Sequence, residues 1–120
     1  MIGPDAAEFM DFIYDNTMST MKPGTCRYGF ILNESGIIYD DGVLVRMPEA
    51  HFLVSCSSSH VPGVFAMLEE WRQDRLPSKQ INVHNSTAET ATITVTGPLS
   101  RNCWRLRASR RRWRTTSSAI

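Results

Sequence analysis

The sequence of 120 residues lacks the features that define several large classes of protein. It has no uncharged apolar run of the length that spans a bilayer, so no membrane segment is predicted. Its first residues show neither the basic stretch nor the apolar core of a secretory signal, which favours a cytoplasmic protein. No G-x-G-x-x-G fingerprint is present, so no dinucleotide-binding unit is predicted.

Cysteine is scarce, and its spacing excludes the common disulfide and metal patterns. The three cysteines, Cys26, Cys56 and Cys103, are odd in number, lie far apart and form no C-x-x-C pair. They have no metal-ligand spacing to the three histidines. None of the histidines has a serine, cysteine or acid in an arrangement typical of a nucleophile. We therefore predict no metal site and expect the cysteines to be small buried apolar residues.

Acidic residues are absent from the end of the chain. Residues 1–100 contain all 12 acids and six of the 13 basic residues, whereas residues 101–120 contain seven arginines and no acid. Arginine beside tryptophan can bind nucleic acid through phosphate pairing and base stacking. We favour a solvated terminus instead, because a nucleic-acid domain usually has its basic face on the folded part. Nucleic acid is therefore not an expected partner.

Hydrophobic spacing predicts two helices. The first begins at Gly3-Pro4-Asp5 and is predicted to end near Met18 to Met21, before the helix breaker Lys22-Pro23-Gly24. The second follows the serines at 57–59, which are predicted to cap it, and has Val61, Val64, Phe65, Leu68 and Trp71 on one face.

Alternating and β-branched segments predict five strands. The first two are joined by a hairpin turn at Asn33 to Gly36. In the second strand, Gly42 predicts a bulge or the close approach of another backbone. In the last, Ala91, Ile93 and Val95 are predicted to face a core. The strands are predicted at residues 25–32, 37–47, 51–55, 81–84 and 90–96. The order of elements indicates an α+β fold, with helices on one face of a mostly antiparallel sheet.

Two adjacent carboxylates, Asp40 and Asp41, lie just past the predicted hairpin turn and next to Gly42. A positioned carboxylate can accept a proton in a reaction. Acids before a glycine are also common turn residues, and the residue types alone favour that structural reading.

Several motifs occur together in residues 3–101. Asn33-Glu34-Ser35-Gly36 is followed four residues later by Asp40-Asp41. The other motifs are Gly3-Pro4-Asp5-Ala6, Cys26-Arg27-Tyr28-Gly29, Asp40-Asp41-Gly42-Val43, Glu69-Glu70-Trp71, and Gly97-Pro98 followed by Ser100-Arg101. This set resembles the folate-binding domain shared by glycine-cleavage aminomethyltransferases and the α subunit of heterotetrameric sarcosine oxidase. The Cys-Arg-Tyr-Gly, Asp-Asp-Gly-Val and Glu-Glu-Trp motifs resemble the sarcosine oxidase subunit more than the aminomethyltransferases.

The resemblance implies roles for two residues. Asp41 matches the family's key acid, whose carboxylate lies against the reduced folate and assists proton movement at the nitrogen that captures a one-carbon unit. Tyr28 matches a position that contacts the pterin, where an aromatic ring can pack on the bicyclic ligand. We therefore predict Asp41 as catalytic, Asp41 and Tyr28 as folate-binding, and Asp40 as structural. The implied cofactor is tetrahydrofolate; FAD, FMN and NAD are expected only in other parts of a full enzyme complex.

The family domain is longer than this chain, and the later elements that complete the folate pocket are missing. Composition also changes abruptly after Arg101. We expect residues 1–101 to be a partial folate-binding domain of the aminomethyltransferase type, and residues 102–120 to be a disordered Arg-rich tail or the product of a truncated or shifted reading frame.

Two functions follow from these expectations. The first is a fragment of a sarcosine oxidase α subunit or aminomethyltransferase-like protein, involved in transferring a one-carbon unit from sarcosine or a glycine derivative to tetrahydrofolate. Other sarcosine oxidase subunits are its implied partners. The alternative is a non-catalytic remnant or interaction module that keeps only the fold. In both cases we expect little or no catalytic activity from the isolated chain.

Overall fold

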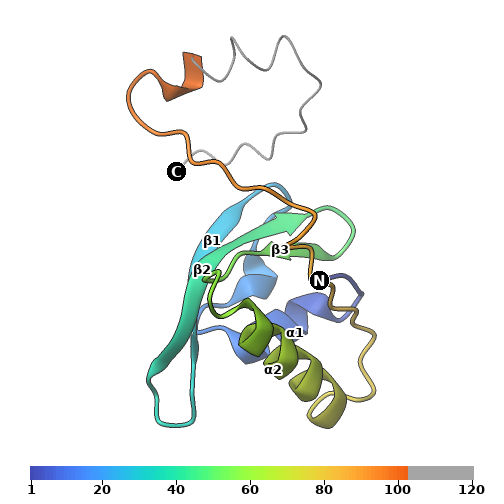
Figure 1. Ribbon diagram of the computed structural model, residues 1–120. Helices are drawn as coiled ribbons and strands as arrows, with labels where there is room; N and C mark the ends of the chain where they lie inside the picture. The colour runs from blue at the N-terminus through green and yellow to red at the C-terminus, as the bar shows by residue number, and fades with distance from the viewer. Residues whose placement is uncertain (103–120) are drawn as a thin grey trace.

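The computed structural model describes residues 1–102. Three antiparallel strands, β1 (Cys26–Leu32), β2 (Ile38–Met47) and β3 (His51–Val54), form a sheet in the order β1-β2-β3. Helices α1 (Ala6–Ile13) and α2 (Val61–Asp74) lie on the same side of this sheet (Figure 1). The predicted α+β fold with an antiparallel sheet and two helices is confirmed. No helix within residues 1–102 is long and apolar enough to span a membrane.

The core forms between the two helices and the inner face of the sheet. Strand positions alternate between the faces, and the inner positions Ile31, Leu44 and Phe52 are fully buried. Two apolar residues of α2, Val64 and Leu68, pack into the same cluster. The buried residues of α1 are Ala6, Phe9, Met10 and Ile13, at the spacing of one helical face. The predicted Phe65 is only half-buried and lies outside this cluster.

Helix α1 is shorter than predicted because the chain after it joins the sheet. Tyr14 turns to extended backbone and forms an antiparallel bridge with Ile31. The Asp15 amide donates to the Phe30 carbonyl at 3.2 Å, and the Asp15 carboxylate accepts from the Phe30 amide at 2.9 Å. These bonds satisfy the outer edge of β1, which a longer helix would leave exposed. The separate 3₁₀ turn η1 (Met18–Thr20) follows.

The hairpin between β1 and β2 contains the predicted turn. The Asn33 carboxamide oxygen accepts from the amides of Ser35 and Ile37, at 3.0 and 2.9 Å, and Gly36 has a φ of +75°. Ile31 pairs with Asp40 whereas Leu32 pairs with Ile38, so Tyr39 is the extra residue of a bulge.

Gly42 has the close backbone contact that its sequence context predicts, although the bulge lies at Tyr39. A Cβ atom at Gly42 would lie 1.9 Å from the Ser55 carbonyl oxygen. Glycine is therefore required here by the approach of the chain that leaves β3.

The other edge of the sheet is closed by the first residues of the chain. The Phe52 amide donates to the Met1 carbonyl at 2.8 Å, and Ile2 bridges both His51 and Asn82. The predicted strand at 81–84 is therefore wrong in extent, since only Asn82 forms a bridge. The segment pairs at this one residue because Ile2 is its pairing partner.

The predicted strand at 90–96 is wrong. This segment has no strand pairing among the described residues, and Ile93 and Val95 are 76% and 44% exposed instead of facing a core. Figure 1 shows it in orange, running away from the sheet and helices. The alternation of threonine with apolar residues favours a strand, but a strand forms only where a partner strand can pair with it. The expectations for Cys103 and for the tail beyond Asn102 lie outside the described residues.

Replacing Gly42 by alanine is expected to separate β2 from the chain after β3. The added methyl group overlaps the Ser55 carbonyl, so Gly42→Ala lowers the free energy of unfolding by about 2–3 kcal/mol. Gly36→Ala is the control, because it meets open space and loses only the ease of a left-handed backbone, about 1 kcal/mol. Urea denaturation at pH 7 measures both. Equal losses would contradict the proposed overlap.

Candidate functional site

Asp40 and Asp41 point to opposite faces of the sheet. They are consecutive residues of β2, and side chains alternate along a strand. Asp40 lies on the inner face and is 3% exposed, whereas Asp41 lies on the outer face, which the helices leave uncovered. The two predicted roles, structural for Asp40 and functional for Asp41, thus fall on different sides of the sheet.

The structure brings the predicted site residues Asp41 and Tyr28 together. Tyr28 pairs with Val43, so Asp41 is its diagonal neighbour on the same face. The Tyr28 hydroxyl donates to Asp41 Oδ2 at 2.5 Å. This hydrogen bond raises the pKa of Tyr28, and desolvation and the charges of Asp41 and Asp15 add to the effect. A carboxylate and a phenol therefore form one hydrogen-bonded unit on the sheet surface.

Apolar side chains surround this unit on the outer face. Tyr28 itself is 55% exposed. We name the outer surface of the sheet the open face; its exposed residues are Tyr28, Leu32, Ile38, Asp41, Val43 and Leu53. A flat apolar ring could lie on this surface while Asp41 accepts a hydrogen bond from its polar edge. Among residues 1–102, Asp41 Oδ1 has no hydrogen-bond donor and stays available.

Asp40 has a complete set of partners on the inner face. Its carboxylate accepts from the Ser57 amide at 3.1 and 3.4 Å and lies 3.2 Å from His60 Nδ1. Burial by itself raises the pKa of Asp40. Hydrogen bonds from Ser57, then His60 and the Asp41 amide, outweigh that effect and hold the pKa below its usual value. Asp40 is therefore a buried anion stabilised by the loop that follows β3.

The contact between His60 and Asp40 is not predicted by the sequence, because 20 residues separate them. The His60 ring also stacks on Tyr39, with centroids 5.9 Å apart and planes 14° apart. Ser57 was predicted to cap α2, but the residue at the cap position is His60 and no side chain caps the helix. The Ser57 amide is directed to Asp40 instead. The serines at 57–59 are the sequence signal in this loop, and they indicate a helix cap.

Two further titratable groups, Tyr14 and Cys56, lie near Asp40. Burial raises the pKa of Tyr14, and the charges of Cys56 and Asp40 raise it further. Burial, followed by the charge of Asp40, also raises the pKa of the Cys56 thiol. Both groups stay protonated at neutral pH, so Cys56 is not an activated nucleophile.

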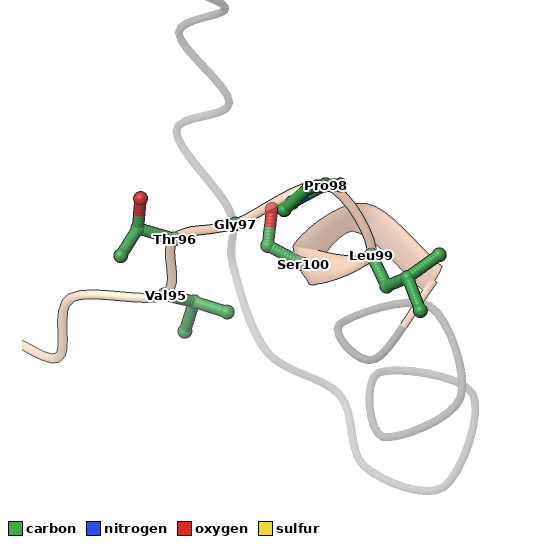
Figure 2. A pocket seen from close by; sticks show the side chains of 6 residues that line it. All are labelled: Val95, Thr96, Gly97, Pro98, Leu99 and Ser100. Carbon is green, nitrogen blue, oxygen red and sulfur yellow. The ribbon is translucent and has the colours of Figure 1, made fainter.

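Elsewhere in residues 1–102, neither the surface hollow nor the titratable side chains form a second candidate site. A hollow beside the chain at 95–100 is lined by Val95, Thr96, Gly97, Pro98, Leu99 and Ser100 (Figure 2). It offers hydroxyl groups but no titratable side chain, so it provides no acid or base. Within residues 1–102, no group of three or more histidine, cysteine or acidic residues is arranged to hold a metal ion.

The buried Asp40 predicts a loss of stability in acid. Its pKa is lowered on folding, so its contribution is complete above the unfolded pKa of about 3.9 and disappears as the pH falls through the lower folded value. Asp40→Asn therefore lowers the free energy of unfolding by about 2 kcal/mol at pH 7, and by less below about pH 4. Urea denaturation from pH 7 to pH 2.5 measures this. The exposed Asp74→Asn, as control, should change stability by about 0.5 kcal/mol or less; an Asp40→Asn deficit that does not depend on pH would contradict the assignment.

The hydrogen bond between Tyr28 and Asp41 predicts a titration that NMR can follow. Asp41→Asn removes the anion that disfavours tyrosinate, so the pKa of Tyr28 should fall toward its ordinary value of 10.0. The ¹³Cζ resonance of labelled tyrosine, assigned with Tyr28→Phe, reports the change. Glu34→Gln removes the same charge from the hairpin turn and should leave the titration unchanged. An unaltered Tyr28 pKa in Asp41→Asn would show that the contact does not form.

Comparison with known proteins shows that the chain is similar to sarcosine oxidase alpha subunits and to aminomethyltransferases. Residues 1–111 match the family model of the GCVT N-terminal domain. The sarcosine oxidase subunit alpha of Corynebacterium sp. (strain P-1) is 39% identical over 100 residues, which are 83% of this chain and 10% of that protein. The aminomethyltransferase of Corynebacterium aurimucosum is 33% identical over 96 residues, which are 80% of this chain and 25% of that protein.

A solved structure agrees with these matches. The glycine cleavage system aminomethyltransferase T of Bartonella henselae aligns with a TM-score of 0.58 and 32% identity, over 61% of this chain and 20% of that one. The chain thus spans between a tenth and a quarter of the length of these relatives. The match over nearly the whole chain, together with the shared fold, shows that the chain belongs to the GCVT N-terminal domain family.

Proposed function

We propose that Asp41 and Tyr28 form part of a folate site, and that the chain takes part in transferring a one-carbon unit to tetrahydrofolate. The donor would be sarcosine or another glycine derivative. The observation that carries the proposal is the hydrogen bond of Tyr28 to Asp41 on the open face. The resemblance to the family assigns the position of the key acid to Asp41. The relatives are sarcosine oxidase subunits and aminomethyltransferases, which supports the reaction class.

The geometry supports a proton-accepting role for Asp41. When an amine attacks an electrophilic one-carbon unit, the nitrogen gains positive charge and must lose a proton. Asp41 presents Oδ1 for this step while its other oxygen accepts from Tyr28. Tyr28 thereby restricts the rotation of the carboxylate, and its ring extends the apolar surface beside it. The catalytic role in this proposal belongs to Asp41, and Tyr28 binds and orients.

The open face fits one side of a reduced folate. Val43 and Leu53 offer apolar contacts for a flat bicyclic ring, and Asp41 offers an acceptor for its polar edge. A pocket normally covers most of a bound ligand, and one sheet face covers only one side. We therefore infer that the rest of the site comes from parts of the protein that this chain does not contain. FAD, FMN and NAD are assigned to other parts of a complete enzyme.

The proposed partners follow from the relatives. The sarcosine oxidase relatives are named as subunits, so we infer association with other subunits of such an enzyme. We also propose that the protein is cytoplasmic. We further propose that residues 1–101 form a partial folate-binding domain and that residues 102–120 are an Arg-rich tail. The second candidate is a non-catalytic remnant or interaction module, and it is supported by a sheet face that covers only one side of a ligand.

Titration with tetrahydrofolate tests the proposal. Loss of a hydrogen bond to a charged group costs about 1.5–3 kcal/mol, so Asp41→Asn should weaken binding about tenfold or more under anaerobic calorimetry. Tyr28→Phe should weaken it about three- to tenfold, because the ring is kept but its hydroxyl no longer restricts the Asp41 carboxylate. Asp74→Asn, on the far end of α2, should bind like the wild type.

The outcomes separate the two candidates. Binding that depends on Asp41 supports the folate site, whereas a folded wild-type chain that gives no heat of binding supports the non-catalytic remnant. Binding that is equal in all four proteins would place any folate contact elsewhere. We expect no steady formation of methylene-tetrahydrofolate by the isolated chain, because the other side of the pocket is missing.

A further inference from the structure

Five consecutive residues of β2, from Tyr39 to Val43, have Asp41 at their centre. The other four all contact the chain that runs from the end of β3 into the first turn of α2. We name that segment, residues 55–63, the clamp segment. Asp41 differs from its neighbours because its side chain contacts Tyr28 on the opposite face of the sheet.

The clamp segment holds β2 on the side before Asp41. The Tyr39 ring stacks on His60. Its hydroxyl oxygen lies 2.4 Å from the position that a Cβ atom at Gly63 would take. The Asp40 carboxylate accepts from the Ser57 amide and lies next to His60 Nδ1. Tyr39 is also the extra residue of the bulge, so these contacts fix the strand at its most irregular point.

The clamp segment also holds β2 on the side after Asp41. The Val43 amide donates to the Ser55 hydroxyl at 3.0 Å, and that hydroxyl donates to the Val43 carbonyl at 2.8 Å. The Ser55 amide donates to the same carbonyl at 3.1 Å. Between them, Gly42 lets the Ser55 carbonyl approach to a distance that no side chain would permit.

These contacts decide which of two adjacent acids is exposed. A shift of one residue in a strand moves every side chain to the other face. Next to a bulge such a shift is a realistic alternative, and here it would expose Asp40 and bury Asp41. The shifted strand would lose the partners of Asp40 and would place a side chain where Gly42 now meets Ser55. The clamp segment thus favours the register that directs Asp41 toward Tyr28.

We propose that Asp40 and Ser55 are positioning residues, which act through the clamp segment to hold the Asp41 carboxylate against Tyr28. Their importance for folate rests on the proposed function, but the positioning itself does not. Asp40 lies on the inner face and Ser55 bonds the backbone of Val43, so both act through the backbone of β2. Tyr14 and Cys56, the other titratable groups near Asp40, stay protonated and do not replace its anionic role.

The Tyr28 titration tests this proposal without any ligand. It is followed by ¹³Cζ NMR in the full chain for the wild type, Asp40→Asn, Ser55→Ala and the control Glu69→Gln. The control breaks the pair of Glu69 with Arg72 on α2 and leaves the clamp segment intact. The charged groups that act on Tyr28 are Asp41 and Asp15, and all variants retain both. A role in folding alone would not move the Tyr28 pKa in a variant that circular dichroism shows to be folded.

We expect Asp40→Asn to lose the upward shift of the Tyr28 pKa, Ser55→Ala to lose part of it, and Glu69→Gln to retain it. Folded Asp40→Asn and Ser55→Ala chains with the wild-type titration would overturn the proposal. If Asp40→Asn does not fold, Ser55→Ala decides, because Ser55 is exposed and its replacement leaves the core intact.

A folate titration of the same variants separates this proposal from the proposed function. If the wild type binds tetrahydrofolate, Asp40→Asn should weaken binding about tenfold, in step with its loss of the Tyr28 shift. Unchanged binding in a variant that has lost the shift would overturn a positioning role for the folate site. A wild type that binds no folate contradicts the proposed function, and the tyrosine result then still decides whether Asp40 and Ser55 position Asp41.

Discussion

The buried carboxylate of Asp40 is the interaction on which the arrangement of the site depends. A buried anion is costly unless it is hydrogen-bonded, and here the Ser57 amide and the His60 ring supply the bonds. Those partners belong to the loop between β3 and α2, so satisfying Asp40 also fixes where α2 begins. Because side chains alternate along β2, the same constraint directs Asp41 to the opposite face. Asp40 thus bonds the loop on the inner face of the sheet, while Asp41 is exposed on the outer face.

The two faces of the sheet differ in burial. The inner face supplies Ile31, Leu44 and Phe52 to a core shared with both helices, and this packing provides the stability of the domain. The open face keeps apolar side chains around Asp41 and Tyr28 without covering them. Such a division suits a domain that contributes one wall of a binding site. It also agrees with the fraction of the longer relatives that the chain represents.

Local signals predicted much of this fold. The hairpin follows from Asn33 and Gly36, and α2 contains all five residues of the apolar face that its spacing predicts. The end of α1 could not be predicted, because Tyr14 and Asp15 leave the helix to bond β1, which is distant in sequence. The threonine-rich alternation at 90–96 was misleading for the same reason, since strand preference needs a partner.

The candidate site shows the same division between local and distant information. The resemblance to a family, rather than spacing, indicated Asp41 and Tyr28. The diagonal contact between them depends on the register of β1 with β2, which a bulge at Gly42 would have changed. The contact of Asp40 with His60 could not be predicted, because 20 residues separate them and no motif contains both.

The closed edges of the sheet have a consequence for how the chain behaves in a crowded solution. Residues 14–16 bond the outer edge of β1, and residues 1 and 2 bond the outer edge of β3. A second molecule that added its own strand would first have to displace one of these segments, so growth into amyloid-like ribbons is disfavoured. Face-to-face stacking through exposed aliphatic groups is then the easier route to aggregation, and it is the route that a bound ligand or a covering domain would block.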